Sequence, residues 1–280
     1  MKNLSERALL VNIKISQWSA RKYDKTVSHE IEKTHNAHDA GRFNKNLIKE
    51  EELSAIKKVA SATRTLLYDN SLPWGDNGDR LLPTSNYFEF LNQFSKYKED
   101  FNSKVDLFIR AYPSLKEEAK ARLNGMFREQ DYPSHSDMKR KFSMDMTFMP
   151  ISNISDFRLN VDQEEVDNIK SNIEAEIYQR ISDATKNIWS RIRDAVQHMV
   201  EKLKEHDAVF RDSLVNNIED LIETLPRLNF TGDRDISNVI ENMKDLIVDP
   251  DDLRHDTRLR KQKADQAEAI LSTVGAFLNC

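Results

Sequence analysis

The stretch that decides the fold is DQEEVDNIKSNIEAEIYQRISDATKNIWSRIRDAVQHMVEKL, residues 162–203. Apolar side chains recur in it every three or four residues, the spacing of one face of an α-helix. The steps average about 3.7 residues, close to the period of a straight helix. At about 1.5 Å per residue such a helix is on the order of 65 Å long. We therefore predict one long helix that a single compact core does not cover, and that packs against other helices of the chain or of a partner.

The apolar stripe of this helix is the candidate partner-binding site. It forms either the core of a helical domain or an interface with another protein, and both interpretations stay open. The residues we single out are Ile173, Ile177, Ile181, Ile188, Trp189, Ile192 and Val196.

Three further helices follow the stripe and are candidates to pack on it. The first spans 210–226 and ends at Pro226, and the second spans 236–247. The last begins at Asp249-Pro250, a strong helix start, and runs to about residue 275. We expect an elongated antiparallel helical hairpin or bundle in this half of the chain.

Two segments before the stripe alternate between apolar and polar residues, which is typical of half-buried strands. They are residues 9–18 and 142–150, and FRLNV at 157–161 is a third, shorter candidate. We predict a small antiparallel sheet that ties the start of the chain to its middle.

The rest of the first half has helical patterns. Helices are expected over 24–38, 49–69 and 84–112, and the last two are separated by a loop at 70–83 that holds two prolines and two glycines. Ser114 and Glu117 form a capping box for a further helix to about residue 127, and Ser134 with Asp137 starts a short one. The predicted fold class is mainly α, with domains at 1–160 (small sheet) and 161–280 (long helices).

The bulk properties narrow the class of protein. The chain has 280 residues, 32% of them charged, a net charge of −5 and one cysteine, Cys280. Such a balance argues against general coating of nucleic acid, and one cysteine excludes an internal disulfide or a thiol metal cluster. No apolar run is long enough for a membrane span or typical of a signal peptide. We expect a cytoplasmic protein.

The segment HEIEKTHNAHDAGRF, residues 29–43, holds three of the seven histidines. On a helix, His35 and His38 would lie on one face, beside carboxylates that bind divalent metals. The spacing lacks the two histidines four apart, with an intervening glutamate, of a zinc protease helix. We favour a solvated polar helix and keep His35 and His38 as weak metal candidates.

Two basic runs are candidates for phosphate contacts. The residues are Lys139, Arg140 and Lys141 in the first run, and Arg254, Arg258, Arg260, Lys261 and Lys263 in the second. The alternative interpretation of the second run is a solvated helix face whose charges are balanced by neighbouring aspartates.

No motif for catalysis or nucleotide binding is present. The chain lacks GxSxG, a Walker motif and GxGxxG, and Gly75–Asp79 lacks the spacing of a calcium loop. We expect no enzyme, no catalytic residue and no cofactor.

The order of several segments resembles a known domain family. They are ISQWSARKYD (15–24), AGRFNKNLI (40–48), TRTLLYDNSLPWGDNGDRLLP (63–83), DYPSHSDMKRKFSMDMTFMPI (131–151) and FRDSLVNNIEDLIETLPRLNFTGD (210–233). The family is an uncharacterised domain of bacteria and their phages, often encoded near MoxR-type AAA ATPases and von Willebrand A-domain proteins. The resemblance implies phage or bacterial origin and an ATPase-linked partner, and it transfers no catalytic residue.

These observations favour a non-enzymatic protein that binds another protein or itself, so a homo-oligomer is expected. The alternative is a nucleic-acid-binding protein that uses the runs 139–141 and 254–263.

Overall fold

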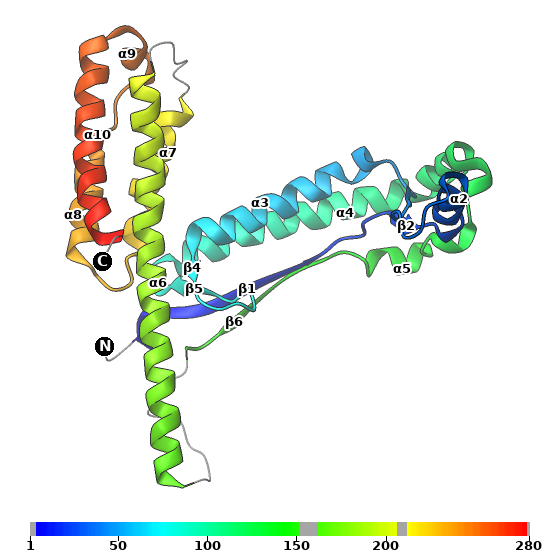
Figure 1. Cartoon of the computed structure of the whole chain (residues 1–280), viewed down its shortest axis with the longest axis horizontal. Helices are drawn as coiled ribbons and strands as arrows, with labels where there is room; N and C mark the ends of the chain where they lie inside the picture. Colours follow the sequence, from blue (N-terminus) through cyan, green and yellow to red (C-terminus); the bar gives the residue numbers. More distant parts are fainter. Residues whose placement is uncertain (1–3, 152–161, 206–211, 279–280) are drawn as a thin grey trace. The chain divides into compact units, whose positions relative to one another are not determined.

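The computed structural model describes residues 4–151, 162–205 and 212–278, and its fold is mainly α with a small antiparallel sheet (Figure 1). The chain divides into two compact units that are interleaved in sequence. The bundle unit consists of Met1–Asn12, Leu67–Phe90 and Thr147–Cys280, and the two-helix unit of Ile13–Leu66 and Leu91–Met146. Residue 160, the expected boundary, lies outside the described residues, so separate domains at 1–160 and 161–280 stay a prediction.

The two predicted strands are confirmed as β1 (Ala8–Ser16) and β6 (Ser143–Met149). They belong to a four-stranded sheet with the order β4-β5-β1-β6. In β1, Val11 is buried whereas Lys14 and Ser16 are exposed, as the alternation predicts. The third candidate strand, 157–161, lies outside the described residues.

The prediction that 70–83 is only a loop is wrong. The segment forms a hairpin of β4 (Leu72–Pro73) and β5 (Arg80–Pro83), and β5 continues into antiparallel pairing with β1. Gly78, with φ +87°, permits the tight turn, and Leu81 and Leu82 are fully buried. The prolines lie at strand ends, where a missing N–H donor does not break the ladder.

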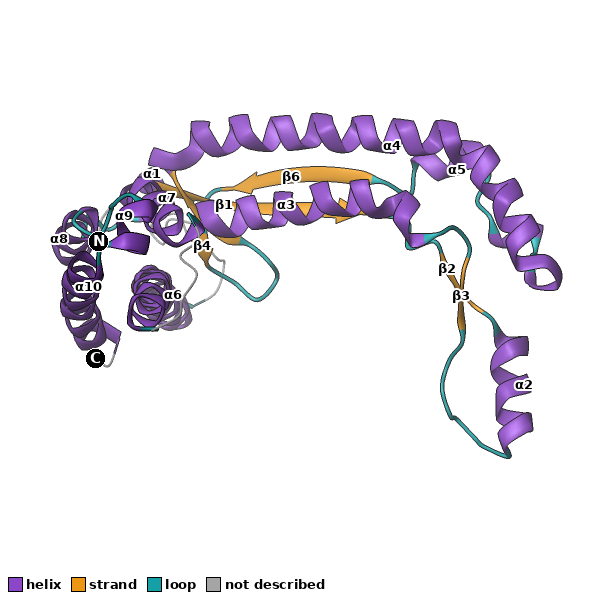
Figure 2. Ribbon diagram, turned by 90° about the horizontal axis from the view of Figure 1, so that it is seen from above, coloured by secondary structure: helices purple, strands orange, loops and turns teal. Residues whose placement is uncertain are grey.

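The two-helix unit contains most of α3 (Ser54–Asn70) and α4 (Tyr87–Leu123), which cover one face of β1 and β6 (Figure 2). The expected break before Ser114 is wrong, because α4 passes through Pro113 without a new cap. Tyr112, Leu115 and Ala119 are buried on the same helix. Packing on both sides of Pro113 therefore outweighs the one backbone hydrogen bond that proline cannot make.

Shorter elements complete the two-helix unit. The polar helix α2 (Lys25–His35) is capped by Asp24, and α5 (His135–Lys139) by Ser134, as the sequence predicts for α5. A two-stranded antiparallel ribbon lies beside α2. The remaining elements here are β2 (Arg21–Tyr23), β3 (Asn44–Asn46), η1 (Glu50–Leu53), η3 (Asn124–Met126) and η4 (Glu129–Asp131).

The long helix is confirmed as α6 (Gln163–Lys204), which has 42 residues. It packs against α7 (Ser213–Leu228) and α10 (Thr257–Leu278), and α8 (Arg234–Lys244) packs against α7 and α10. The four helices thus enclose one core, and α6 and α10 run in opposite directions (Figure 1). The bundle unit also contains α1 (Leu4–Arg7) and η2 (Thr84–Asn86).

Two expected helix ends in the bundle are wrong. Pro226 lies inside α7, which ends at Leu228, because the buried Leu225 and Leu228 keep the last turn packed. The last helix is interrupted: α9 (Pro250–His255) ends at Asp256, whose carboxylate accepts hydrogen bonds from the backbone N–H groups of Arg258 and Leu259. Asp256 therefore caps a new helix, α10.

Candidate functional site

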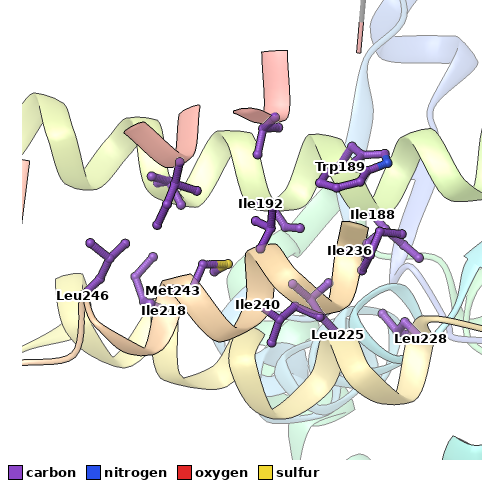
Figure 3. Packing of buried hydrophobic residues seen from close by; sticks show 14 of the residues in the cluster. Ile188, Trp189, Ile192, Ile218, Leu225, Leu228, Ile236, Ile240, Met243 and Leu246 are labelled. Atoms are coloured by element: carbon purple, nitrogen blue, oxygen red, sulfur yellow. The ribbon is translucent and has the colours of Figure 1, made fainter. Parts of the chain in front are cut away.

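The second half of the α6 stripe is the core of the four-helix bundle. From Ile181 to Leu203 its apolar side chains are buried, and Ile188 and Ile192 are completely enclosed. Figure 3 shows Ile188 and Ile192 directed towards Ile236 and Met243 of α8, with Leu225 of α7 beside them. These contacts are internal to one chain, so this half of the stripe needs no partner protein.

Trp189 joins the same core from the neighbouring face of α6. Its ring stacks on Phe277 of α10, with 4.4 Å between ring centroids and an interplanar angle of 4°. The side chain is buried. Trp189 therefore fixes the register between the two antiparallel helices, as an offset aromatic pair does in a core.

The first half of the α6 stripe is less covered. Ile169 and Ile173 are half-buried and do not belong to the bundle core, and Ile177 only packs against its edge. Tyr178, next to Ile177, is 55% exposed. Among the described residues, the stripe thus leaves the bundle core between Ile181 and Ile177, and Val166 near its start is buried outside that core. We call Ile169, Ile173, Ile177 and Tyr178 the open stripe.

The charges around the open stripe are mostly acidic. Residues 163–180 carry five carboxylates and two basic side chains, Lys170 and Arg180. Arg180 forms an ion pair with Glu176 one turn earlier and lies over the ring of Trp74. The open stripe therefore offers an apolar centre with an acidic border, the pattern of a helix that receives another helix.

The first basic run lies on α5 and the turn after it. Lys139 is 3.9 Å from a carboxylate oxygen of Asp106, and Arg140 pairs with Asp137 on its own helix. Lys141 is exposed and forms no ion pair with a described residue. Two of the three charges are thus already balanced within the chain.

The second basic run is divided between α9 and α10. Arg254 pairs with Asp212 and Asp251, and Lys263 donates to the backbone carbonyl of Asp245. The hydrogen bonds to the two carboxylates raise the pKa of Arg254 above its ordinary value. Arg258 and Lys261 are exposed on α10, and Arg260 is half-buried. Only part of the run is therefore directed to solvent.

The structure separates His35 from His38. Helix α2 ends at His35, and Asn36 takes the left-handed conformation with φ 49°. The helical spacing that would place both imidazoles on one face is therefore wrong. Both histidines are exposed, and His29 lies 3.7 Å from Glu32. The described residues contain no group of three histidine, cysteine or acidic side chains arranged to hold a metal ion.

Sequence reasoning missed a buried ion cluster in the two-helix unit. The Lys45 ammonium lies 3.1 Å from Asp24 Oδ2 and 2.8 Å from Asp131 Oδ2, and donates to the Met126 carbonyl at 2.9 Å. Burial alone would lower the pKa of Lys45, but the hydrogen bonds to Asp131 and Asp24 outweigh it and raise that pKa. The hydrogen bond from Lys45 lowers the pKa of Asp24. Lys45 and Asp24 are therefore both charged at neutral pH.

A second missed feature is a pair of arginines in the bundle unit. Arg191 donates to the carbonyls of Tyr68, Asp69 and Ser71, so it caps the last turn of α3. Arg80 donates to the Ser71 hydroxyl at 2.7 Å and lies over the Tyr68 ring. Burial, helped by the charge of Arg191, lowers the pKa of Arg80 to about 10. Backbone carbonyls at a helix end give no sequence pattern. The hydrogen bonds of Arg191 and Arg80 were therefore not predictable from the sequence.

The fold and the α6 stripe define a class: mainly helical proteins built around one long helix whose second half is the core of a bundle. The chain belongs to the family described as "Protein of unknown function (DUF3150)", whose model matches residues 5–227. No curated protein and no solved structure matches the chain. In the part of the chain that the structure describes, no helix has the length and apolar character needed to cross a membrane.

Proposed function

We propose that this chain is a non-enzymatic protein that binds another protein or assembles with itself, and that the open stripe of α6 is the contact. The observation that carries the proposal is the change of burial along one continuous stripe. Ile188 and Ile192 are enclosed by α7, α8 and α10, whereas Ile169 and Ile173 lie on the same face without cover from the bundle core. The open stripe continues the helix face that packs in the bundle. A helix of another molecule is therefore the favoured partner for it.

Self-assembly is the form of the proposal that one purified protein can test. Size-exclusion chromatography with light scattering should give a mass that is a multiple of the 32.6 kDa chain. The variant Ile173→Glu places a charge inside the contact and should shift the mass to that of one chain.

The matched control is Ser171→Glu, which adds the same charge on the exposed opposite face of the same turn. It should keep the mass of the native protein. A native protein that is monomeric at every concentration, or a loss of assembly in both variants alike, would remove self-assembly through the open stripe.

An AAA ATPase as the partner rests on the resemblance alone, as does phage or bacterial origin. A cytoplasmic site of action, in the host cytoplasm if a phage encodes the chain, rests on the single cysteine and on the lack of a signal-peptide pattern. A pull-down with a MoxR-type AAA ATPase from the same genome would test the adaptor role. Binding that survives in Ser171→Glu and is lost in Ile173→Glu supports it, and equal binding by both variants contradicts it.

Nucleic-acid binding through 139–141 and 254–263 is the second candidate function. What favours it is the exposure of Lys141, Arg258 and Lys261, which form no ion pair with a described residue. The internal ion pairs of Lys139, Arg140 and Arg254 weaken it, because each must be released before a phosphate is bound. A binding assay at low ionic strength on Arg258→Gln/Lys261→Gln tests it; unchanged binding overturns it.

A further inference from the structure

A cationic hollow of about 310 Å³ lies in the two-helix unit, where β2 leads into α2. Its wall is made by three segments that are far apart in sequence: residues 22–26, Lys45, and Arg128 with Gln130 and Asp131. Four cationic side chains and two carboxylates contribute to it. They are Lys22, Lys25, Lys45, Arg128, Asp24 and Asp131.

Both carboxylates of the hollow are already used at its base. Asp24 and Asp131 hold the Lys45 ammonium at 3.1 and 2.8 Å, and Asp24 also accepts hydrogen bonds from the backbone N–H groups of Thr26 and Val27. The side chain of Lys45 is only 2% exposed. These groups form a buried base with a net charge of −1, since two carboxylates surround one ammonium.

The cations of the rim have no carboxylate partner among the described residues. Lys22, Lys25 and Arg128 are exposed and belong to no ion pair there, although the Arg128 guanidinium donates to the Thr26 hydroxyl at 3.3 Å. This distinguishes the rim from Arg140 and Arg254, which are balanced by neighbouring aspartates. The three rim cations and a base of net charge −1 leave the hollow with a net charge of +2. In a chain of net charge −5, this makes the hollow a local site for an anion.

An exposed aromatic ring stands beside the cations. All three residues of β2 are exposed, and the Tyr23 ring, between Lys22 and Asp24 in sequence, is 42% exposed. The Arg42 guanidinium lies 5.9 Å from the centroid of that ring. The antiparallel pairing of Tyr23 with Asn44 holds the backbone under the ring in an extended ribbon.

Unpaired cations next to an exposed aromatic ring match the chemistry of a single nucleic-acid strand. The cations neutralise backbone phosphates, and an aromatic ring stacks on a base that no complementary strand covers. A phospholipid surface needs apolar side chains that enter the acyl region, and the hollow wall supplies none besides Tyr23. In a duplex the faces of the bases are stacked on one another, so the Tyr23 ring has no free base face to contact.

We propose that this hollow binds the phosphate backbone of single-stranded nucleic acid through Lys22, Lys25 and Arg128, while Tyr23 stacks on a base. The site is separate from the open stripe and from the runs 139–141 and 254–263. It therefore does not depend on the proposed function.

The test is fluorescence anisotropy of the full chain with labelled oligo-dT and oligo-rU. With three phosphate contacts, raising salt from about 50 to about 200 mM should weaken binding roughly twentyfold. The variant Lys22→Gln/Lys25→Gln/Arg128→Gln should lose most of the affinity and of the salt dependence. These side chains are exposed, so circular dichroism should show an unchanged fold.

The matched control is Lys58→Gln/Lys96→Gln/Lys120→Gln, which removes the same charge from exposed positions of the same unit that belong neither to the hollow nor to the runs 139–141 and 254–263. It should bind as the native chain does. For the ring, Tyr23→Leu should weaken binding about tenfold while Tyr23→Phe keeps it, because stacking needs a ring and not a hydroxyl.

Four outcomes would each overturn the proposal. They are no binding of either oligonucleotide at low ionic strength, equal loss in the control triple variant, tighter binding of duplex DNA than of single strands, and tighter binding of phosphatidylserine vesicles than of oligonucleotides.

Discussion

Lys45 shows how a single buried charge can organise a unit. It connects β3 to the cap of α2 through Asp24 and to η4 through Asp131, two contacts that local sequence does not suggest. A buried charge is stable only while its partners are present, because desolvation of an unpaired ion is expensive. The cluster therefore makes the start of α2, β3 and the segment after α4 depend on one another.

Replacing Lys45 with methionine should destabilise the two-helix unit by about 3–5 kcal/mol, because two carboxylates are left buried without a cation. Urea denaturation combined with hydrogen exchange at the Leu47 amide, which is bonded to the Ala20 carbonyl, measures the loss. The control Lys49→Met removes an exposed lysine four residues further along the chain. It should change the free energy of unfolding by less than about 0.5 kcal/mol. Equal stability of both variants would contradict the role of the cluster.

The same cluster predicts how stability depends on acid. The folded state lowers the pKa of Asp24 below its ordinary value of 3.8, chiefly through the hydrogen bond from Lys45. Its stabilisation is thus complete above pH 3.8 and is lost as the pH falls through the lower, folded value. Acid denaturation of the native chain should show this loss. The variant Lys45→Met lacks the main cause of the lowered pKa. In that variant, the contribution of Asp24 to the pH dependence of the free energy of unfolding should shrink or vanish.

At the scale of elements, α6 is one helix with two environments. Ile192 is enclosed by the bundle, whereas Ile173 is half-buried on the open stripe. Ile192→Ala should lower the free energy of unfolding by about 2–5 kcal/mol, since it leaves a cavity in a packed core. Ile173→Ala should lower the free energy of unfolding of the isolated chain far less, and its main effect should be weaker association. Thermal unfolding of both variants at low concentration separates the two effects, and equal losses would show that the stripe has a single environment.

The elements also show what sequence can and cannot predict. The long helix, the two alternating strands, the Asp249-Pro250 start and the Ser134 cap were predictable, because each depends on residues within one or two turns. Proline was the main source of error: Pro113 and Pro226 lie inside helices. Tertiary packing on neighbouring residues outweighs a missing backbone donor, and that packing is invisible locally.

The candidate sites divide in the same way. The stripe was predictable from its spacing, but where it changes from core to open surface was not, because that depends on how far α7, α8 and α10 reach along α6. The Lys45 cluster and the Arg191 cap involve partners 21 to 123 positions away, so no spacing pattern exists for them. The expectation that His35 and His38 lie on one helix face was wrong, because the helix ends at His35 and Asn36 takes the left-handed conformation.

At the scale of the whole molecule, the start of the chain belongs to the bundle unit. Ala8 is part of the bundle core, Arg7 donates to the carbonyl of Phe230, and Thr84 donates to the carbonyl of Arg7. Deleting residues 1–11 should therefore reduce hydrogen-exchange protection in α7 and α8, although those helices keep their own sequence. The control Lys14→Ala changes an exposed residue of the same strand and should leave that protection intact. Unchanged protection after the deletion would contradict the role of the N-terminal segment.

The interleaving of the two units has a consequence for protein synthesis. Arg7 leaves the ribosome 223 positions before Phe230, its hydrogen-bond acceptor. At roughly 5–20 residues per second, the first segment waits about 11–45 s for that acceptor to be made. Everything in the two-helix unit has been translated by residue 146, so that unit can fold during elongation before the contact between Arg7 and Phe230 can form. The bundle unit can therefore close over Arg7 only after the two-helix unit has been made, so the two units complete their folding in a fixed order.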